Sequence, residues 1–265
     1  MSPTNHKTNI LLVFILALLP LATAQSRGPA INSPAHFSGS DASTPVAITP
    51  APDHADALWS AYNAAVEHSA VWRNEDLRRL KPAVVGADGK IWVATATRYD
   101  GQSPLYGDTW VTIIPELQNL CRQFTGDVAM QVRAVLGLPP DKEIPKVVTM
   151  KVQPADIFRP TPDPDPWTLC PCGDPEGNAC RFNANVQCGN KFPSDASSSH
   201  IQWIATTTLA VRQTPGGYPW THLGYTYNWK PGADPYGTSE YVVRKGAIVT
   251  DVATTSLDQY CKPAE

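Results

Sequence analysis

Apolar residues recur at helical spacing in the first half of the chain. Residues 115–126 and 128–136 both show this period, and a glycine marks the end of each segment. A short helix is expected after Asn74, since acidic residues open it, basic residues close it and Pro82 follows. Another helix is expected after Asp53, which can cap it. One face of that helix carries Leu58, Trp59, Tyr62, Ala65 and Val66.

Segments rich in β-branched and aromatic residues predict strands at 90–98, 109–114 and 146–152. The same signal predicts later strands at 201–212, 222–229, 240–244 and 247–252. The dipeptide Lys245-Gly246 suggests a hairpin between the last two. We therefore expect an α+β fold, a single disulfide-braced domain with N-terminal helices, a mixed sheet and an antiparallel C-terminal part.

The N-terminus has the pattern of a secretory signal peptide over residues 1–24. A polar start with Lys7 precedes an apolar run of about a dozen residues, shorter than the roughly 20 that span a bilayer. Ala22-Thr23-Ala24 fits the cleavage site. We expect a secreted or periplasmic protein with no membrane span after cleavage. Residues 25–52 predict a flexible Pro/Ser/Ala-rich leader, and residues 53–265 the single domain.

The charge balance narrows the choice of partners. The 265 residues include 21 Lys and Arg against 24 Asp and Glu. Nucleic-acid binding depends on neutralising phosphates, so this balance argues against a general nucleic-acid binder.

Six cysteines suit an oxidising compartment and predict disulfides with no free thiol: Cys121, Cys170, Cys172, Cys180, Cys188 and Cys261. Fifteen pairings remain open. Four of the six crowd into a Pro- and Gly-rich stretch that would need cross-links to become ordered. Cys121 and Cys261 would then tie the C-terminus to a core helix, a long-range link worth about 4–5 kcal/mol.

No metal site is expected. The spacing of the clustered cysteines matches no common zinc pattern, and a calcium-like run after Asp174 has Ala179 where glycine is required. The long Pro/Cys-rich loop at 153–199 is uncommon inside a domain unless it is functional or cross-linked.

The most informative stretch for function is residues 216–243, which hold seven Tyr and Trp residues. These rings suit either a core strand or a ligand-binding surface, since each offers an apolar face and a polar tip. Glu240 begins an apolar strand directly after a Gly/Pro loop. There it is either an acid/base carboxyl beside an aromatic wall or a charge that protects an edge strand.

Four segments resemble an uncharacterised family of exported bacterial proteins with no known activity: WVTIIPELQNLC (110–121), VQPADIFRPTPDP (152–164), GYPWTHLGYTYNW (217–229) and SEYVVRKGAIV (239–249). The resemblance implies export and one shared architecture. Members of that family tend to have a cysteine where this chain has Thr161, so their disulfide pattern is not carried over.

The order of elements also resembles ADP-ribosyltransferase-like domains, which bind NAD in a cleft. A strand with Thr112, a helix at Pro115, a strand at Val147 and a late Glu240 follow that order. The resemblance implies a catalytic role for Glu240, with Thr112 and Tyr225 lining the cleft. Position 238 is Thr, so the paired acidic motif of those enzymes is missing.

Two functions follow as hypotheses. The first is a ligand-binding or interaction module without catalysis, whose partner is an unknown small molecule or protein and whose cofactor, if any, is unknown. Its candidate ligand-binding residues are Trp220, Tyr225, Tyr227 and Thr112. The alternative is an exported, NAD-using enzyme centred on Glu240.

Overall fold

The computed structural model describes residues 54–71, 73–170, 192–213 and 216–263 and, for the backbone alone, 173–176 and 179–182. Residues Pro50–Glu265 form one compact unit. The expected signal peptide and leader lie outside the described residues. None of the described helices is both long and apolar enough to cross a membrane.

A six-stranded sheet forms the centre of this unit, in the order β10-β3-β1-β2-β9-β4. Its strands are β1 (Ile91–Thr97), β2 (Thr109–Ile113), β3 (Lys146–Val152), β4 (Ile157–Phe158), β9 (Tyr241–Val243) and β10 (Thr250–Ser256). Two short hairpins accompany it: β5 (Gly173–Glu176) with β6 (Ala179–Phe182), and β7 (Tyr225–Tyr227) with β8 (Tyr236–Ser239). The α+β class is confirmed, but every pairing of the described strands is antiparallel, so the sheet is not mixed.

The expected hairpin at Lys245-Gly246 is wrong. A turn forms there, with Gly246 at a φ of 85° and the Ala247 amide donating to the Arg244 carbonyl at 3.2 Å. The chain then crosses the sheet instead of folding back. β9 pairs with β2 and β4, while β10 starts only at Thr250 and pairs with β3.

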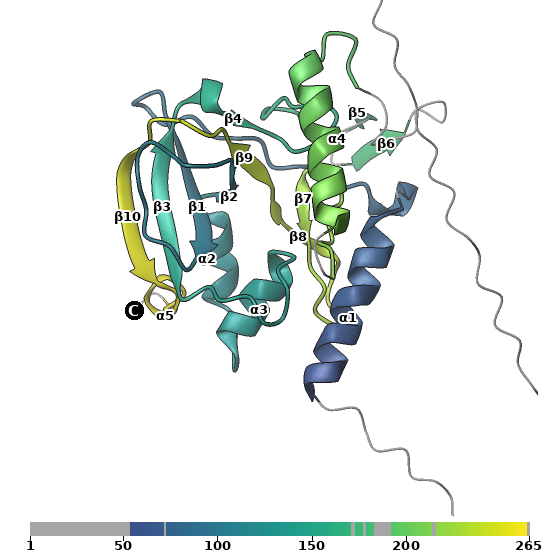
Figure 1. Cartoon of the computed structure of the whole chain (residues 1–265), viewed down its shortest axis with the longest axis vertical. Coiled ribbons are helices and arrows are strands. Elements are labelled where there is room, and N and C mark those ends of the chain that lie inside the picture. The colour runs from purple at the N-terminus through teal and green to yellow at the C-terminus, as the bar shows by residue number, and fades with distance from the viewer. Residues whose placement is uncertain are drawn as a thin grey trace, which may run out of the picture. The chain divides into compact units, whose positions relative to one another are not determined.

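The helices are α1 (His54–Ser69), α2 (Glu116–Cys121), α3 (Val128–Val135), α4 (Ser198–Gln213) and α5 (Leu257–Tyr260). The helix expected after Asp53 is confirmed, and its predicted apolar face packs around Trp229 and Ala134. The helix expected at 115–126 is shorter, since α2 ends at Cys121. Figure 1 shows α2 and α3 close to the sheet, and α1 and α4 on the side away from β10.

Two predicted elements have the wrong type. Residues 201–212, expected to be a strand, lie within α4. The segment is rich in β-branched residues, which favour a strand, but its less exposed positions recur every three to four residues, as in a helix. The inward side of α4 carries His200, Trp203, Ile204, Thr207, Thr208 and Val211. The helix expected after Asn74 is one 3₁₀ turn (Asn74–Asp76). Beyond it the Leu80 and Ala83 amides donate to backbone carbonyls of Leu169 and Pro166, so tertiary pairing outweighs the local charge order.

A disulfide joins Cys121 at the end of α2 to Cys261 after α5, across 140 residues of sequence. Both sulfurs lie in the core that α2, α3 and α5 form against one face of the sheet. The predicted bracing is therefore confirmed for this pair. Cys170 is also disulfide-bonded, whereas the predictions for Cys172, Cys180 and Cys188, and the zinc and calcium alternatives considered there, lie outside the described side chains.

Candidate functional site

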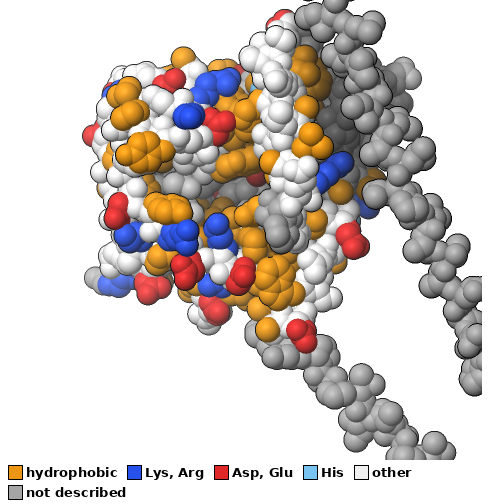
Figure 2. Space-filling model, viewed as in Figure 1, with side chains coloured by type: hydrophobic (Ala, Val, Ile, Leu, Met, Phe, Trp, Pro, Cys, Tyr) orange, Lys and Arg blue, Asp and Glu red, His pale blue; other side chains and the backbone are white. Residues whose placement is uncertain are grey.

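A cavity of about 920 Å³ opens where the sheet splits. β1 pairs with β3 over seven residue pairs but with β2 over only two. Beyond that point β1 and β2 separate, while the other edge of β2 pairs with β9. Residues 95–97 of β1 and 109–111 of β2 therefore line opposite sides of a gap. Figure 2 shows the molecule hollowed beside α4, with hydrophobic side chains gathered around the hollow. The volume lies toward the upper end of the range for small-molecule sites.

Several other parts of the chain contribute to the wall of the cavity. Leu117 comes from α2, residues 136–138 follow α3, Thr207 and Val211 come from α4, and residues 218–220 precede β7. Two exposed tyrosines, Tyr99 and Tyr106, lie among the lining residues of the loop between β1 and β2. The wall is thus largely apolar and aromatic.

Glu240 is the buried acidic residue of this wall. It connects β8 to β9 and is only 8% exposed, and its backbone amide donates to the Gly224 carbonyl at 3.0 Å. Its Oε2 atom has no hydrogen-bond partner among the described residues. Burial without a compensating partner raises the pKa of the Glu240 carboxyl well above its usual value.

Gly237 lets β8 approach closely enough to place Glu240 there. A Cβ atom at this position would lie 2.3 Å from both the Thr226 hydroxyl and the Val135 carbonyl oxygen. The chain beyond Val135 and the strand with Thr226 therefore lie directly against β8. A side chain at position 237 would push β8 away from the end of α3.

The threonines around Glu240 already have partners. The Thr226 hydroxyl donates to the Val135 carbonyl at 2.6 Å and accepts from the Thr238 amide at 2.8 Å. The Thr112 hydroxyl donates to Oε2 of Glu116 at 3.4 Å. Glu240 therefore stands out among the polar side chains at this end of the cavity, because its Oε2 remains unpaired.

Three tryptophans form a continuous aromatic wall. The Trp110 ring lies edge-on to Trp220 at 5.5 Å and 6.1 Å from Trp203, and Trp203 is 6.1 Å from Trp220. Trp110 and Trp220 line the cavity, and Trp203 reaches them from α4. The Nε1 atom of Trp220 is buried without a partner in the part of the chain that the structure describes. The wall thus holds one unpaired donor as well as the unpaired carboxyl oxygen.

His222 fixes Trp220 in place. The two rings stack at 3.7 Å, and the residue takes a left-handed φ of 57°, which is uncommon outside glycine. The Thr208 hydroxyl and Nε2 of His222 share a hydrogen bond of 3.1 Å. Burial lowers the pKa of His222 to about 4, so the ring is neutral near pH 7. This contact links the aromatic wall to α4.

Asp108 makes a second link to α4. Its carboxylate accepts from Nε1 of Trp203 at 2.7 Å and from the Lys245 backbone amide at 2.8 Å. Both donors are uncharged, and no ion pair of Asp108 occurs among the described residues. Asp100 also lines the cavity, but Lys146 neutralises it at 2.6 Å.

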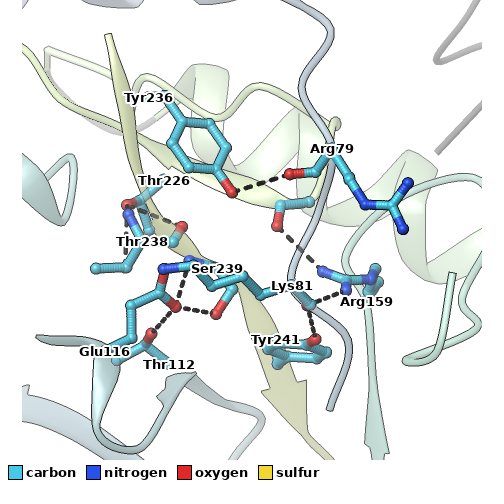
Figure 3. Close-up of polar contacts among 11 residues, drawn as sticks. Arg79, Lys81, Thr112, Glu116, Arg159, Thr226, Tyr236, Thr238, Ser239 and Tyr241 are labelled. Carbon is cyan, nitrogen blue, oxygen red and sulfur yellow. Dashed lines mark hydrogen bonds and ion pairs between the residues drawn. The ribbon is translucent and has the colours of Figure 1, made fainter. Parts of the chain in front are cut away.

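Glu116 lies nearby in a fully paired network (Figure 3). Its Oε1 atom meets the Lys81 ammonium at 2.8 Å. Its Oε2 atom accepts from the Ser239 amide at 3.0 Å, from the Ser239 hydroxyl and from Thr112. Ser239 and Glu240 are consecutive in an extended segment, so their side chains lie on opposite sides of it. One points into the Glu116 network and the other lines the cavity.

The structure brings together four of the five predicted site residues. Glu240, Thr112, Trp220 and Tyr227 line the same cavity. Tyr225 does not: its hydroxyl donates to the Asp76 carbonyl at 2.7 Å, and its ring packs with leucines. Tyr225 is therefore a core residue and not part of the cavity wall.

Sequence reasoning missed Trp110 and the contribution of α4. Trp110 could have been found, because it lies two residues from Thr112 and so shares its face of β2. Trp203, Thr207 and Val211 could not be found once their segment had been assigned as a strand. Their spacing of four residues was the available signal.

No protein-family model matches the chain, and no curated protein or solved structure matches it significantly. Among the described residues, no group of three or more His, Cys, Asp and Glu could hold a metal ion. The interpretation of the cavity therefore rests on its own geometry.

Proposed function

We propose that this protein binds a small, largely apolar molecule in the cavity between β1, β2 and α4, with Glu240 as the polar anchor. The observation that carries the proposal is the bare Oε2 atom of Glu240 in the wall of a large apolar cavity. A buried polar atom without a partner costs stability, and a ligand that supplies the missing partner would remove that cost.

The composition of the wall supports a ligand of drug-like size. Binding pockets of this volume are typically apolar and aromatic with a few polar groups that fix orientation. The tryptophans supply the apolar surface, and Glu240 and Nε1 of Trp220 supply the orienting groups. We include export in the proposal because residues 1–24 fit a signal peptide, and the Cys121–Cys261 disulfide is typical of an oxidising compartment.

The proposal predicts binding of an uncharged fluorescent probe, N-phenyl-1-naphthylamine, with a rise in fluorescence as it leaves water. Thr207→Trp should weaken this binding at least tenfold, because Thr207 lines the cavity from α4 and a large ring would fill it. Fluorescence titration of the oxidised protein measures both dissociation constants.

Thr206→Trp is the matched control, since Thr206 is the exposed neighbour on the same helix and does not line the cavity. It should bind the probe as the parent protein does. Equal binding by both variants would show that the probe binds elsewhere, and absence of any binding would count against the proposal.

The NAD-using enzyme stays a second candidate because Thr112 and Glu240 line one cavity, as that hypothesis requires. A carboxyl with a raised pKa in an apolar site also suits acid catalysis. Adding NAD as a competitor in the same titration distinguishes the NAD-using enzyme from a protein that binds an apolar ligand without catalysis. Displacement of the probe, followed by release of nicotinamide that Glu240→Gln abolishes, would favour the enzyme.

A further inference from the structure

Two carboxyl groups at the cavity have no cationic partner among the described residues. Glu240 lies in the wall with its Oε2 atom bare, and Asp108 receives hydrogen bonds from uncharged N–H groups alone. Of the other charged residues in the lining, Asp100 is neutralised by Lys146, and Lys142 is the basic one. The acidic groups near the aromatic wall therefore exceed the basic ones.

The aromatic rings share the cavity wall with these carboxyl groups. Trp110 and Trp220 line the cavity with Glu240, and Trp203 donates directly to Asp108. The face of an indole ring carries negative potential and attracts cations, tryptophan most strongly of the aromatic side chains. Uncharged, apolar walls also strengthen an ionic contact, because water does not screen it.

We propose that the ligand of this cavity is an organic cation, an amine or quaternary ammonium compound whose charged group binds among the tryptophan rings near Glu240 and Asp108. This inference rests on the ligand-binding function proposed above and names the chemical class of the ligand. A cation would give the Glu240 carboxyl the partner that the protein does not provide.

The test compares two probes of the same shape that differ in charge, phenyltrimethylammonium and tert-butylbenzene, by displacement of N-phenyl-1-naphthylamine. The cation should bind at least tenfold more tightly than its uncharged isostere. Glu240→Gln should reduce the affinity for the cation at least tenfold and change that for tert-butylbenzene less than threefold.

Glu67→Gln is the matched control, because Glu67 is an exposed residue of α1 outside this cavity and the change in net charge is the same. It should leave both affinities unchanged. Asp108→Asn provides a second variant, in which the single amide oxygen can accept from Trp203 while the hydrogen bond from the Lys245 backbone amide is lost. It should weaken cation binding at least threefold, whether or not Glu240→Gln folds.

The outcomes separate this inference from the proposed function. Binding of tert-butylbenzene with no preference for the cation would overturn the inference and leave the ligand-binding proposal intact. A cation preference that survives in both Glu240→Gln and Asp108→Asn would also overturn it. Failure of all three compounds to bind would count against both.

Discussion

Two glutamates in this protein are buried to the same extent and have opposite surroundings. Glu116 is 7% exposed and Glu240 is 8% exposed. Glu116 meets a lysine, a backbone amide and two hydroxyls, whereas the Oε2 atom of Glu240 meets no partner among the described residues. The two glutamates meet consecutive residues of one extended segment. The Ser239 side chain points to Glu116, and the next residue in the chain is Glu240 itself.

The comparison separates a residue that maintains the fold from one available for binding. A buried carboxylate with all its partners stabilises the segments that supply them, here α2, β8 and the Lys81 chain. A buried carboxyl without them destabilises the protein and persists where it serves another purpose. The paired glutamate therefore belongs to the framework, and the proposed function assigns the unpaired one to the binding site.

The same substitution at the two positions should have opposite effects on stability at pH 7. Glu116→Gln should lower the free energy of unfolding by about 2–3 kcal/mol, because the amide cannot accept from all of its donors. We keep this figure low because the Lys81 side chain is 62% exposed and its ion pair is screened. Glu240→Gln should raise the free energy of unfolding by about 1–3 kcal/mol, since it removes a buried ionisable group.

Urea denaturation of the oxidised variants measures both changes. A loss of stability in Glu240→Gln comparable to that in Glu116→Gln would mean that Glu240 has a structural partner. The comparison between framework and site would then fail.

The sequence predicts individual helices and strands better than it predicts which of them lie next to one another around the cavity. The strands that became β1, β2 and β3 and the helices that became α1 and α3 follow from local periodicity. On the edge away from β1, β2 pairs with β9, which comes more than 120 residues after β2 in the chain. Periodicity within a segment carries no information about which strands pair.

The candidate site was predictable in part for the same reason. A charged residue directly before an apolar strand predicts Glu240 as a site residue, and Glu240 does line the cavity. Tyr225 came from the same aromatic stretch and lies in the core, because local sequence does not tell which face meets Asp76. No local pattern predicts the role of Glu116, since its partners Lys81 and Ser239 are distant in sequence.

The pH dependence of stability should sharpen the comparison. The folded protein keeps a proton on Glu240 at pH values where the unfolded chain, with a pKa near 4.5, has lost it. Unfolding then releases a proton, so this residue makes stability fall as pH rises above about 4.5, by about 1.4 kcal/mol per unit until the folded pKa is reached. The advantage of Glu240→Gln over the parent protein should therefore grow with pH.

The quantity to compare is the difference in free energy of unfolding between the parent protein and Glu240→Gln, because other groups also titrate in this pH range. His222, with its pKa lowered to about 4, makes stability rise between about pH 4 and its ordinary value of 6.5, and both proteins share that effect. The other titratable groups that line the cavity with Glu240 are Tyr99, Asp100, Tyr106, Asp108, Lys142, Tyr218 and Tyr227. Denaturation at several pH values from 4 to 8 gives the difference, and a constant difference would contradict the assignment.

The smallest expected effect concerns Thr112, which lies between the two glutamates. It lines the cavity, yet its hydroxyl donates to Glu116, so Thr112→Val should lower the free energy of unfolding by only about 0.5–1 kcal/mol. A double-mutant cycle shows whether the Thr112 hydroxyl interacts with Glu116 or with Glu240. When Thr112→Val is combined with Glu116→Gln, the coupling energy should be about 0.5 kcal/mol or more, because each single variant affects the same Thr112–Glu116 hydrogen bond. With Glu240→Gln it should be close to zero. Coupling to Glu240 alone would place the Thr112 hydroxyl in the binding site instead of the framework.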